Sequence, residues 1–143
     1  AANEMRLEVR ARAKQPGESA AADATATVGP PVASLLGEPL AYRGIARALF
    51  PAADGRYRRT ERATIEAVLS TEAAPAGVRL LDRGGNPLTT PVATRERVDA
   101  TGVRWMVAEV SLAPFTDGDY VVELEAMRDE VRERRLFAIR VVR

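Results

Sequence analysis

The sequence predicts an all-β protein, and three observations support that fold class. Apolar and charged residues alternate along several stretches, most clearly at residues 120–126 and 136–143. Alternation with a period of two is the pattern of a strand with one buried face. Turn residues divide the chain at intervals close to the roughly 8–12 residues typical of sandwiches, and no segment shows sustained helical periodicity. We therefore expect an antiparallel β-sandwich of the immunoglobulin or fibronectin-III type.

The N-terminal part of the chain is expected to lie outside this sandwich. Residues 5–13 alternate strictly between apolar and charged side chains, so we expect a strand-forming arm over residues 1–14. The following residues are small and polar, which predicts a flexible linker and an irregular lead-in over residues 15–39. The sandwich domain is then expected over residues 40–143.

Within the domain, the first strand is expected around residues 45–50 and the next over residues 59–69. In the second of these, alternate positions should face the core, and the positions between them should face solvent. The expected inward residues are Ala63, Ile65, Ala67 and Leu69, and the expected outward residues are Arg62, Thr64 and Glu66. The inward alanines are small, so a bulky side chain should pack over them, and Trp105 is the candidate.

Three further features complete the predicted sandwich. Residues 78–92 indicate a hairpin with its turn at residues 82–86, and Pro87 and Pro91 make its second arm an edge strand. Residues 103–112 are apolar on both faces, which indicates a central strand. Tyr120 follows a proline- and glycine-containing bend, as does the tyrosine of immunoglobulin-type sandwiches whose hydroxyl bonds to upstream backbone.

The densest basic cluster is the candidate interaction surface. It consists of Arg56, Arg58, Arg59 and Arg62. Guanidinium groups at this density could bind phosphate or an acidic partner. The interpretation we favour is a solvated ladder of cross-strand ion pairs with Glu61, Glu66 and the carboxylates of adjacent strands.

The acidic residues are expected to be structural and not to bind metal. Asp117, Asp119 and Glu123 offer hard oxygen ligands two to four positions apart, but a calcium loop needs about six or more. Asp-Gly-Asp is also ordinary turn chemistry, and the same interpretation applies to Asp82. We therefore expect no metal site and no cofactor.

The residue inventory also argues against an enzyme. The chain contains no histidine and no cysteine, so the usual triads, thiol nucleophiles and histidine metal sites cannot be formed. A serine–lysine pair would have to use Lys14, which lies in the arm. A pair of catalytic carboxylates is the other alternative. However, the candidate residues are expected on strands, pointing to solvent or to arginines: Glu109, Glu123 and Glu125.

Charge and hydropathy restrict the partners. The formal net charge is +1, whereas nucleic-acid binding normally requires a clear basic excess. No apolar run approaches the roughly 18 residues that a membrane span requires, so direct membrane insertion is not expected. The expected partner is a protein or another domain of the same polypeptide.

Several short segments together resemble a known family. They are residues 36–43 (LGEPLAYR), 57–62 (YRRTER), 80–88 (LLDRGGNPL), 104–115 (RWMVAEVSLAPF), 118–120 (GDY) and 138–143 (AIRVVR). In this order they resemble the C-terminal region of bacterial von Willebrand factor A (VWFA)-related domain proteins. In that family an upstream A-type domain carries a metal site built on an Asp-x-Ser-x-Ser motif. That motif is absent here, so no metal ligand transfers to this chain.

The resemblance implies a non-catalytic accessory or interaction β-domain of an exported bacterial protein, with a periplasmic or secreted location. The alternative function is a carbohydrate- or ligand-binding sandwich, for which a surface Trp105 beside Tyr42 or Tyr57 would be the indication. A further alternative is self-association, because the strand at residues 3–13 could pair with the edge of another copy.

Overall fold

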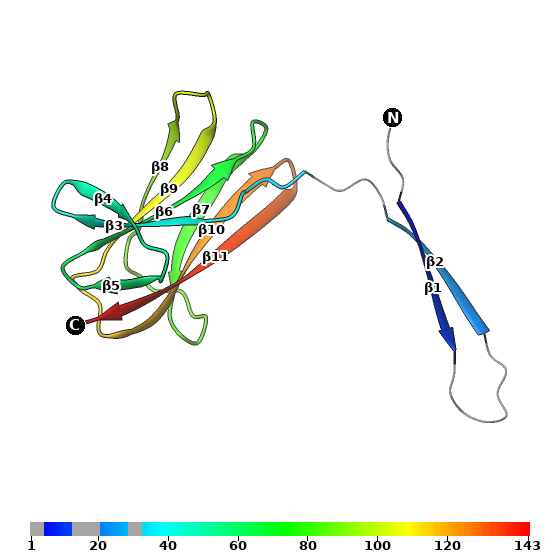
Figure 1. Ribbon diagram of the computed structural model, residues 1–143, viewed down its shortest axis with the longest axis horizontal. Coiled ribbons are helices and arrows are strands. Elements are labelled where there is room, and N and C mark those ends of the chain that lie inside the picture. The colour runs from blue at the N-terminus through cyan, green and yellow to red at the C-terminus, as the bar shows by residue number, and fades with distance from the viewer. Residues whose placement is uncertain (1–4, 13–20, 29–32) are drawn as a thin grey trace. The chain divides into compact units, whose positions relative to one another are not determined.

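The computed structural model describes residues 5–12, 21–28 and 33–143, with side chains from residue 33 onward. The chain forms two compact units, Ala1–Ala33 and Ser34–Arg143. Both units are built from strands, and the described residues include no helix that could cross a membrane (Figure 1). The predicted all-β fold class is therefore confirmed.

The first unit contains one antiparallel hairpin. Strand β1 (Met5–Arg12) pairs with β2 (Ala21–Val28), in a register that runs from Met5 opposite Val28 to Arg12 opposite Ala21. Strand β1 agrees with the expected arm. Strand β2 corrects the expectation of a flexible linker over residues 15–39. Small residues have little apolar area to bury, but their backbone N–H and C=O groups can still form hydrogen bonds with a neighbouring strand. Residues 13–20 and 29–32 of that expected region lie outside the described residues.

The second unit consists of two sheets. The four-stranded sheet has the order β5-β11-β10-β7, and the five-stranded sheet has the order β4-β3-β6-β9-β8. Only the β5–β11 pair is parallel. The bounds are β3 Leu40–Ile45, β4 Ala48–Pro51, β5 Arg56–Arg58, β6 Arg62–Leu69, β7 Ala74–Leu81, β8 Ala93–Val98, β9 Arg104–Ser111, β10 Gly118–Arg128 and β11 Val131–Val142.

One hydrophobic core collects the inward residues of both sheets. Strand β6 contributes the four residues predicted for it, Ala63, Ile65, Ala67 and Leu69, all of which are buried. From the other sheet come alternate residues of β10 and β11, including Val122, Leu124, Ala126, Ile139 and Val141. Full burial of one large aliphatic side chain contributes about 1.5–3 kcal/mol, so this shared core is the main source of stability.

Trp105 is not the residue that packs over the β6 alanines. In β9 the residues beside Ala67 and Ile65 are Met106 and Ala108, and these occupy the core. Trp105 alternates to the outer face, where it lies opposite Val68. The prediction of a central strand is confirmed, because β9 lies between β6 and β8.

Two other boundaries differ from expectation. Leu35 and Leu36 are fully buried, and Leu36 bridges to Leu69, so the expected lead-in belongs to the domain from residue 34. The strand expected around residues 45–50 is found in part as β4 at Ala48–Pro51, but residues 46–47 form the turn of the β3–β4 hairpin, where Ala46 has a φ of 55°.

The predicted hairpin at residues 78–92 is confirmed only at its turn. The Leu88 amide donates to the Leu80 carbonyl at 2.8 Å, and a single bridge joins Leu81 to Pro87. The chain then leaves for the other sheet, where β8 is the edge strand. The prolines explain this departure, because neither can donate to a continued ladder.

Tyr120 makes the predicted upstream bond. Its hydroxyl donates to the Thr116 carbonyl at 3.0 Å, and its ring meets Phe115 edge to face at 5.1 Å. These contacts attach the start of β10 to the preceding bend.

Candidate functional site

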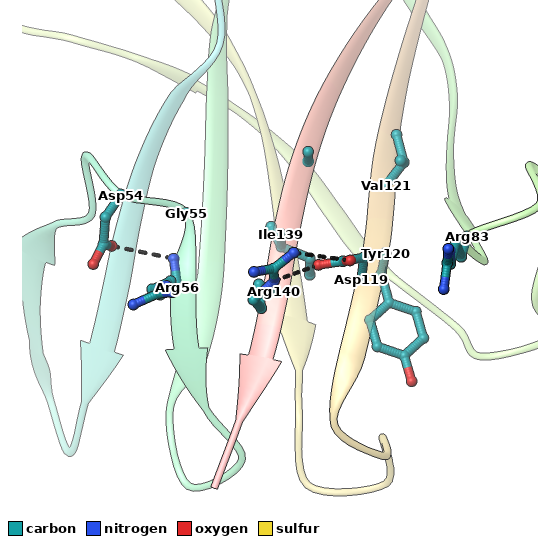
Figure 2. Close-up of a pocket in the computed structure, with 10 residues that line it drawn as sticks. Asp54, Gly55, Arg56, Arg83, Asp119, Tyr120, Val121, Ile139 and Arg140 are labelled. Atoms are coloured by element: carbon teal, nitrogen blue, oxygen red, sulfur yellow. Dashed lines mark hydrogen bonds and ion pairs between the residues drawn. The ribbon is translucent and has the colours of Figure 1, made fainter.

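A shallow groove of about 410 Å³ crosses the outer face of the four-stranded sheet. The alternation that sends Val122 and Ile139 into the core turns their neighbours outward. Val121 and Ala138 are cross-strand partners and lie together in the groove. The groove is bounded by charged residues from β5, β10, β11 and the turn after β7 (Figure 2).

The charged residues form a row across the strands. In the strand register, Arg56 of β5 lies opposite Arg140 of β11, and Arg140 lies opposite Asp119 of β10. The Arg140 guanidinium group donates two hydrogen bonds to the Asp119 carboxylate, from Nε to Oδ1 at 2.6 Å and from Nη2 to Oδ2 at 3.0 Å. Figure 2 shows Arg56 and Arg83 on opposite sides of this ion pair.

The central ion pair stays charged over the whole physiological pH range. Hydrogen bonding from Arg140 lowers the pKa of Asp119 from its usual value, and the positive charge of Arg83 lowers it further. The same hydrogen bond raises the pKa of Arg140. The Asp119–Arg140 pair contributes no net charge, and the other lining carboxylate, Asp54, is paired with Arg43 at 2.9 Å, so Arg56 and Arg83 determine the electrostatic character of the groove.

The Arg56 wall depends on a glycine turn. Gly55 has a φ of 63°, a region that side-chain-bearing residues seldom adopt, and an added Cβ would lie 3.0 Å from the Ala138 carbonyl oxygen. This close approach lets the Gly55 carbonyl accept from the Arg140 amide at 2.8 Å. The Asp54 carboxylate accepts from the Arg56 amide at 3.1 Å. Together these contacts place β5 beside β11.

The Arg83 wall is fixed by the neighbouring aspartate. One carboxylate oxygen of Asp82 accepts from the backbone amides of Gly84 and Asn86, each at 2.8 Å. The Asn86 side chain bonds the same carboxylate, and this contact is the main reason that the pKa of Asp82 is lowered. Arg83 therefore projects from an ordered turn.

Arg56 and Arg83 form no ion pair with any carboxylate of residues 33–143. The planar fork of an arginine suits a carboxylate or a phosphate group. The groove thus combines a neutral centre with two available cationic groups.

The four arginines of the predicted cluster do not line one pocket. Arg56 lines the groove, whereas Arg59 and Arg62 line a separate pocket of about 290 Å³, and Arg58 lines neither. All four side chains are exposed. Arg59 donates to the Ala113 carbonyl at 2.8 Å.

The favoured ladder of ion pairs from this cluster is wrong. Glu66 pairs with Arg97, and the Glu61 carboxylate accepts from the Arg58 backbone amide at 2.9 Å. Tyr57 points into the core, so its neighbours Arg56 and Arg58 lie on the outer face of the four-stranded sheet. Glu66 lies on the outer face of the other sheet, where Arg56 and Arg58 cannot reach it. Arg62 lies on the same strand as Glu66, but the partner of Glu66 is Arg97.

The glutamates considered for catalysis point to arginines, as expected. Glu123 accepts from Arg79 at 2.8 and 2.5 Å, Glu125 pairs with Arg132 and Arg134, and Glu109 pairs with Arg95 at 3.3 Å. Asp117 lies 3.1 Å from Arg143. The described part of the chain contains no group of three or more potential metal-binding side chains.

Trp105 is half-buried on the outer face of the five-stranded sheet, where its ring contacts Arg97 and Asp99. The Arg97 guanidinium lies over it, 4.8 Å from the ring centroid. The indole nitrogen donates to Asp99 at 2.9 Å. Hydrogen bonds from Thr101 and then Trp105 lower the pKa of that carboxylate. Arg97 occupies one face of this ring, so a sugar would have to stack on the other face.

Sequence reasoning placed Asp119 in a turn and missed Arg83 and Arg140. The usable signal was the turn at residues 129–130, because counting outward from it pairs Asp119 with Arg140. Comparison with protein-family models, curated proteins and solved structures finds no match for this chain.

Proposed function

We propose that residues 34–143 form a non-catalytic interaction domain of the immunoglobulin type, which binds a protein partner through the outer face of its four-stranded sheet. The fold proposal is supported by strand order. Immunoglobulin sandwiches combine an ABED sheet with a CFG sheet. Taking β3, β6, β7, β8, β9, β10 and β11 as A to G, the two sheets here have the orders A-B-E-D and G-F-C.

Two details support the same proposal. Tyr120 lies near the start of β10, the strand equivalent to F, and bonds to backbone a few residues upstream, as the tyrosine corner does. Strand β4, which forms a hairpin with β3, and the short parallel strand β5 are additions at the sheet edges. Neither changes the central order.

A binding role is supported above all by one observation, the groove in which Arg56 and Arg83, without a carboxylate partner among residues 33–143, lie on either side of a neutralised ion pair. A non-catalytic role is supported by the pairing of Glu109, Glu123 and Glu125 with arginines, which engages the carboxylates that were considered for catalysis in ion pairs.

The wider setting is proposed from the family resemblance alone. The segments resembling VWFA-related proteins suggest an accessory domain of an exported bacterial protein, with a periplasmic or secreted location. The partner is then another domain of the same polypeptide or a separate protein.

The proposal can be tested without knowing the partner. A displayed library of random peptides is selected against the full chain, and the recovered peptides are mapped by amide chemical-shift changes in NMR. We expect the shifts to concentrate on β10, β11 and β5, with Arg140 and Val121 among the affected amides. Binders that map instead to the five-stranded sheet, or a selection that yields none, would contradict the proposal.

A further inference from the structure

We infer that the groove recognises an extended acidic segment of a protein, in which carboxylates stand on either side of a short neutral stretch. This inference rests on the proposed function, because it names the ligand class of the same groove. It follows from the order of charges in the row, from the groove floor and from the rigidity of both walls.

The order of charges favours separated carboxylates. Arg140 is already held by Asp119 through two hydrogen bonds, so the centre of the row offers no free cation. The guanidinium groups of the groove that have no carboxylate partner among residues 33–143 are those of Arg56 and Arg83 at the two sides. Each can take one carboxylate in a paired, charge-assisted contact.

The same arrangement disfavours ligands with dense negative charge. A polyphosphate lying between Arg56 and Arg83 would bring its central charges over the ionised Asp119 carboxylate. Hydrogen bonding from Arg140 keeps that carboxylate ionised by lowering its pKa. Like charges placed this close across an interface repel each other and suppress the binding of such a ligand.

The floor suits a neutral stretch of peptide. Ala138 is exposed, Val121 is half-buried, and neither carries a polar side chain. The small Ala138 side chain lets a ligand backbone come close to β11.

Nucleic acid fits this floor poorly. Strands that bind single-stranded nucleic acid present free aromatic faces on which the bases stack. The one aromatic residue lining the groove is Tyr120, whose ring packs on Phe115 and whose hydroxyl is bonded to Thr116. The formal net charge of +1 also provides little general attraction for a polyanion.

The backbone of both walls is held by hydrogen bonds before a ligand arrives. The Arg56 amide is held by Asp54, and the Asp82 carboxylate closes the turn that carries Arg83. A binding surface that is already ordered avoids part of the entropy cost of association.

The test uses the full chain and a fluorescein-labelled peptide in which two Asp-Glu pairs flank a neutral Ser-Ala stretch. Binding is measured by fluorescence anisotropy for the wild type and for the double variant R56E/R83E. We expect the variant to bind at least about tenfold more weakly, equivalent to ~1.4 kcal/mol. Circular dichroism confirms that each variant is folded.

The matched control is R47E/R62E, which changes net charge by the same amount. Arg47 lies in the β3–β4 turn and Arg62 at the start of β6, and neither forms an ion pair with residues 33–143. We expect its affinity to stay within about twofold of wild type, because exposed charges outside the groove contribute little. Equal weakening by both double variants would overturn the inference, since it would indicate unspecific electrostatic attraction.

Two more probes distinguish the ligand classes. A peptide with its four acidic residues contiguous, and inorganic tripolyphosphate as a competitor, should both bind more weakly than the flanked peptide. Tighter binding by either overturns the inference. If library-selected peptides map to this sheet face but are neutral, the inference fails while the proposed function stands. If selected peptides map elsewhere, the proposed function fails.

Discussion

Removing the Arg97 side chain should be one of the most destabilising changes on the outer surface of this domain. Its guanidinium group bonds the Glu66 carboxylate, whose side chain is only 7% exposed, and stacks on Trp105 at 4.8 Å. The substitution Arg97→Ala leaves Glu66 enclosed by its neighbours without a cation. Breaking a fully buried ion pair costs about 3–5 kcal/mol. Because the Arg97 side chain is 33% exposed, we expect a smaller loss of about 2–3 kcal/mol.

The assay is urea unfolding followed by circular dichroism, with Trp105 fluorescence as a second probe. The matched control is Arg95→Ala, on the same strand β8 and the same outer face. Arg95 pairs with Glu109 at 3.3 Å, and both side chains are well exposed, at 51% and 30%. That exposed pair should contribute no more than about 1 kcal/mol.

A double-mutant cycle isolates the pairing itself. Glu66→Gln keeps the shape of the side chain but removes its charge, so Arg97→Ala should cost less in that background. We expect a coupling energy of about 1–2 kcal/mol between the two positions. Additive effects, or an Arg97→Ala cost no larger than that of Arg95→Ala, would refute the argument that burial of Glu66 makes its partner essential.

Three further outcomes are expected. Gly55→Ala should lower the free energy of unfolding by about 2 kcal/mol in urea, which is more than Gly102→Ala should. Both glycines have a positive φ that alanine adopts with strain, but only at Gly55 would the added Cβ lie close to backbone, the Ala138 carbonyl oxygen. Burial raises the pKa of Tyr57 to about 12, so ultraviolet titration should find it protonated at pH 11. The raised value means that its stabilising contribution is complete below pH 10 and is lost between pH 10 and 12, by about 2–3 kcal/mol, in wild type but not in Tyr57→Phe. A fragment of residues 34–143 should unfold like the full chain, because the members of the hydrophobic core lie within it; a large loss of stability would instead support an arm that packs on the domain.

Strands whose two faces differ were predictable from the sequence. The inward residues of β6 and the β10–β11 hairpin follow the period-two pattern, since a one-residue shift would expose every core side chain. Strand β9 was harder, because Trp105, Val107, Met106 and Ala108 are all apolar. Its faces could not be told apart by hydropathy, and Trp105 was placed on the wrong one.

The N-terminal and connecting segments were less predictable for a different physical reason. In β2 the residues are small and polar, so their pairing rests on backbone groups that every residue has. The segment with Leu35 and Leu36 is held against the end of β6 by one bridge and by backbone hydrogen bonds. So short a contact leaves no periodic pattern of hydropathy in the sequence. Such segments are positioned by tertiary contacts that a local pattern does not contain.

The groove and the core have a common origin in the β10–β11 hairpin. Its turn at residues 129–130 sets a single register, which places Tyr120 beside Ile139 on the core side and Asp119 beside Arg140 on the other. A shift by one residue would remove the Asp119–Arg140 pair and the core contact together. The charged row is therefore held by the same packing energy that stabilises the domain. Substitutions that alter only the outward residues, such as Arg56 and Arg83, can change recognition while leaving the fold intact.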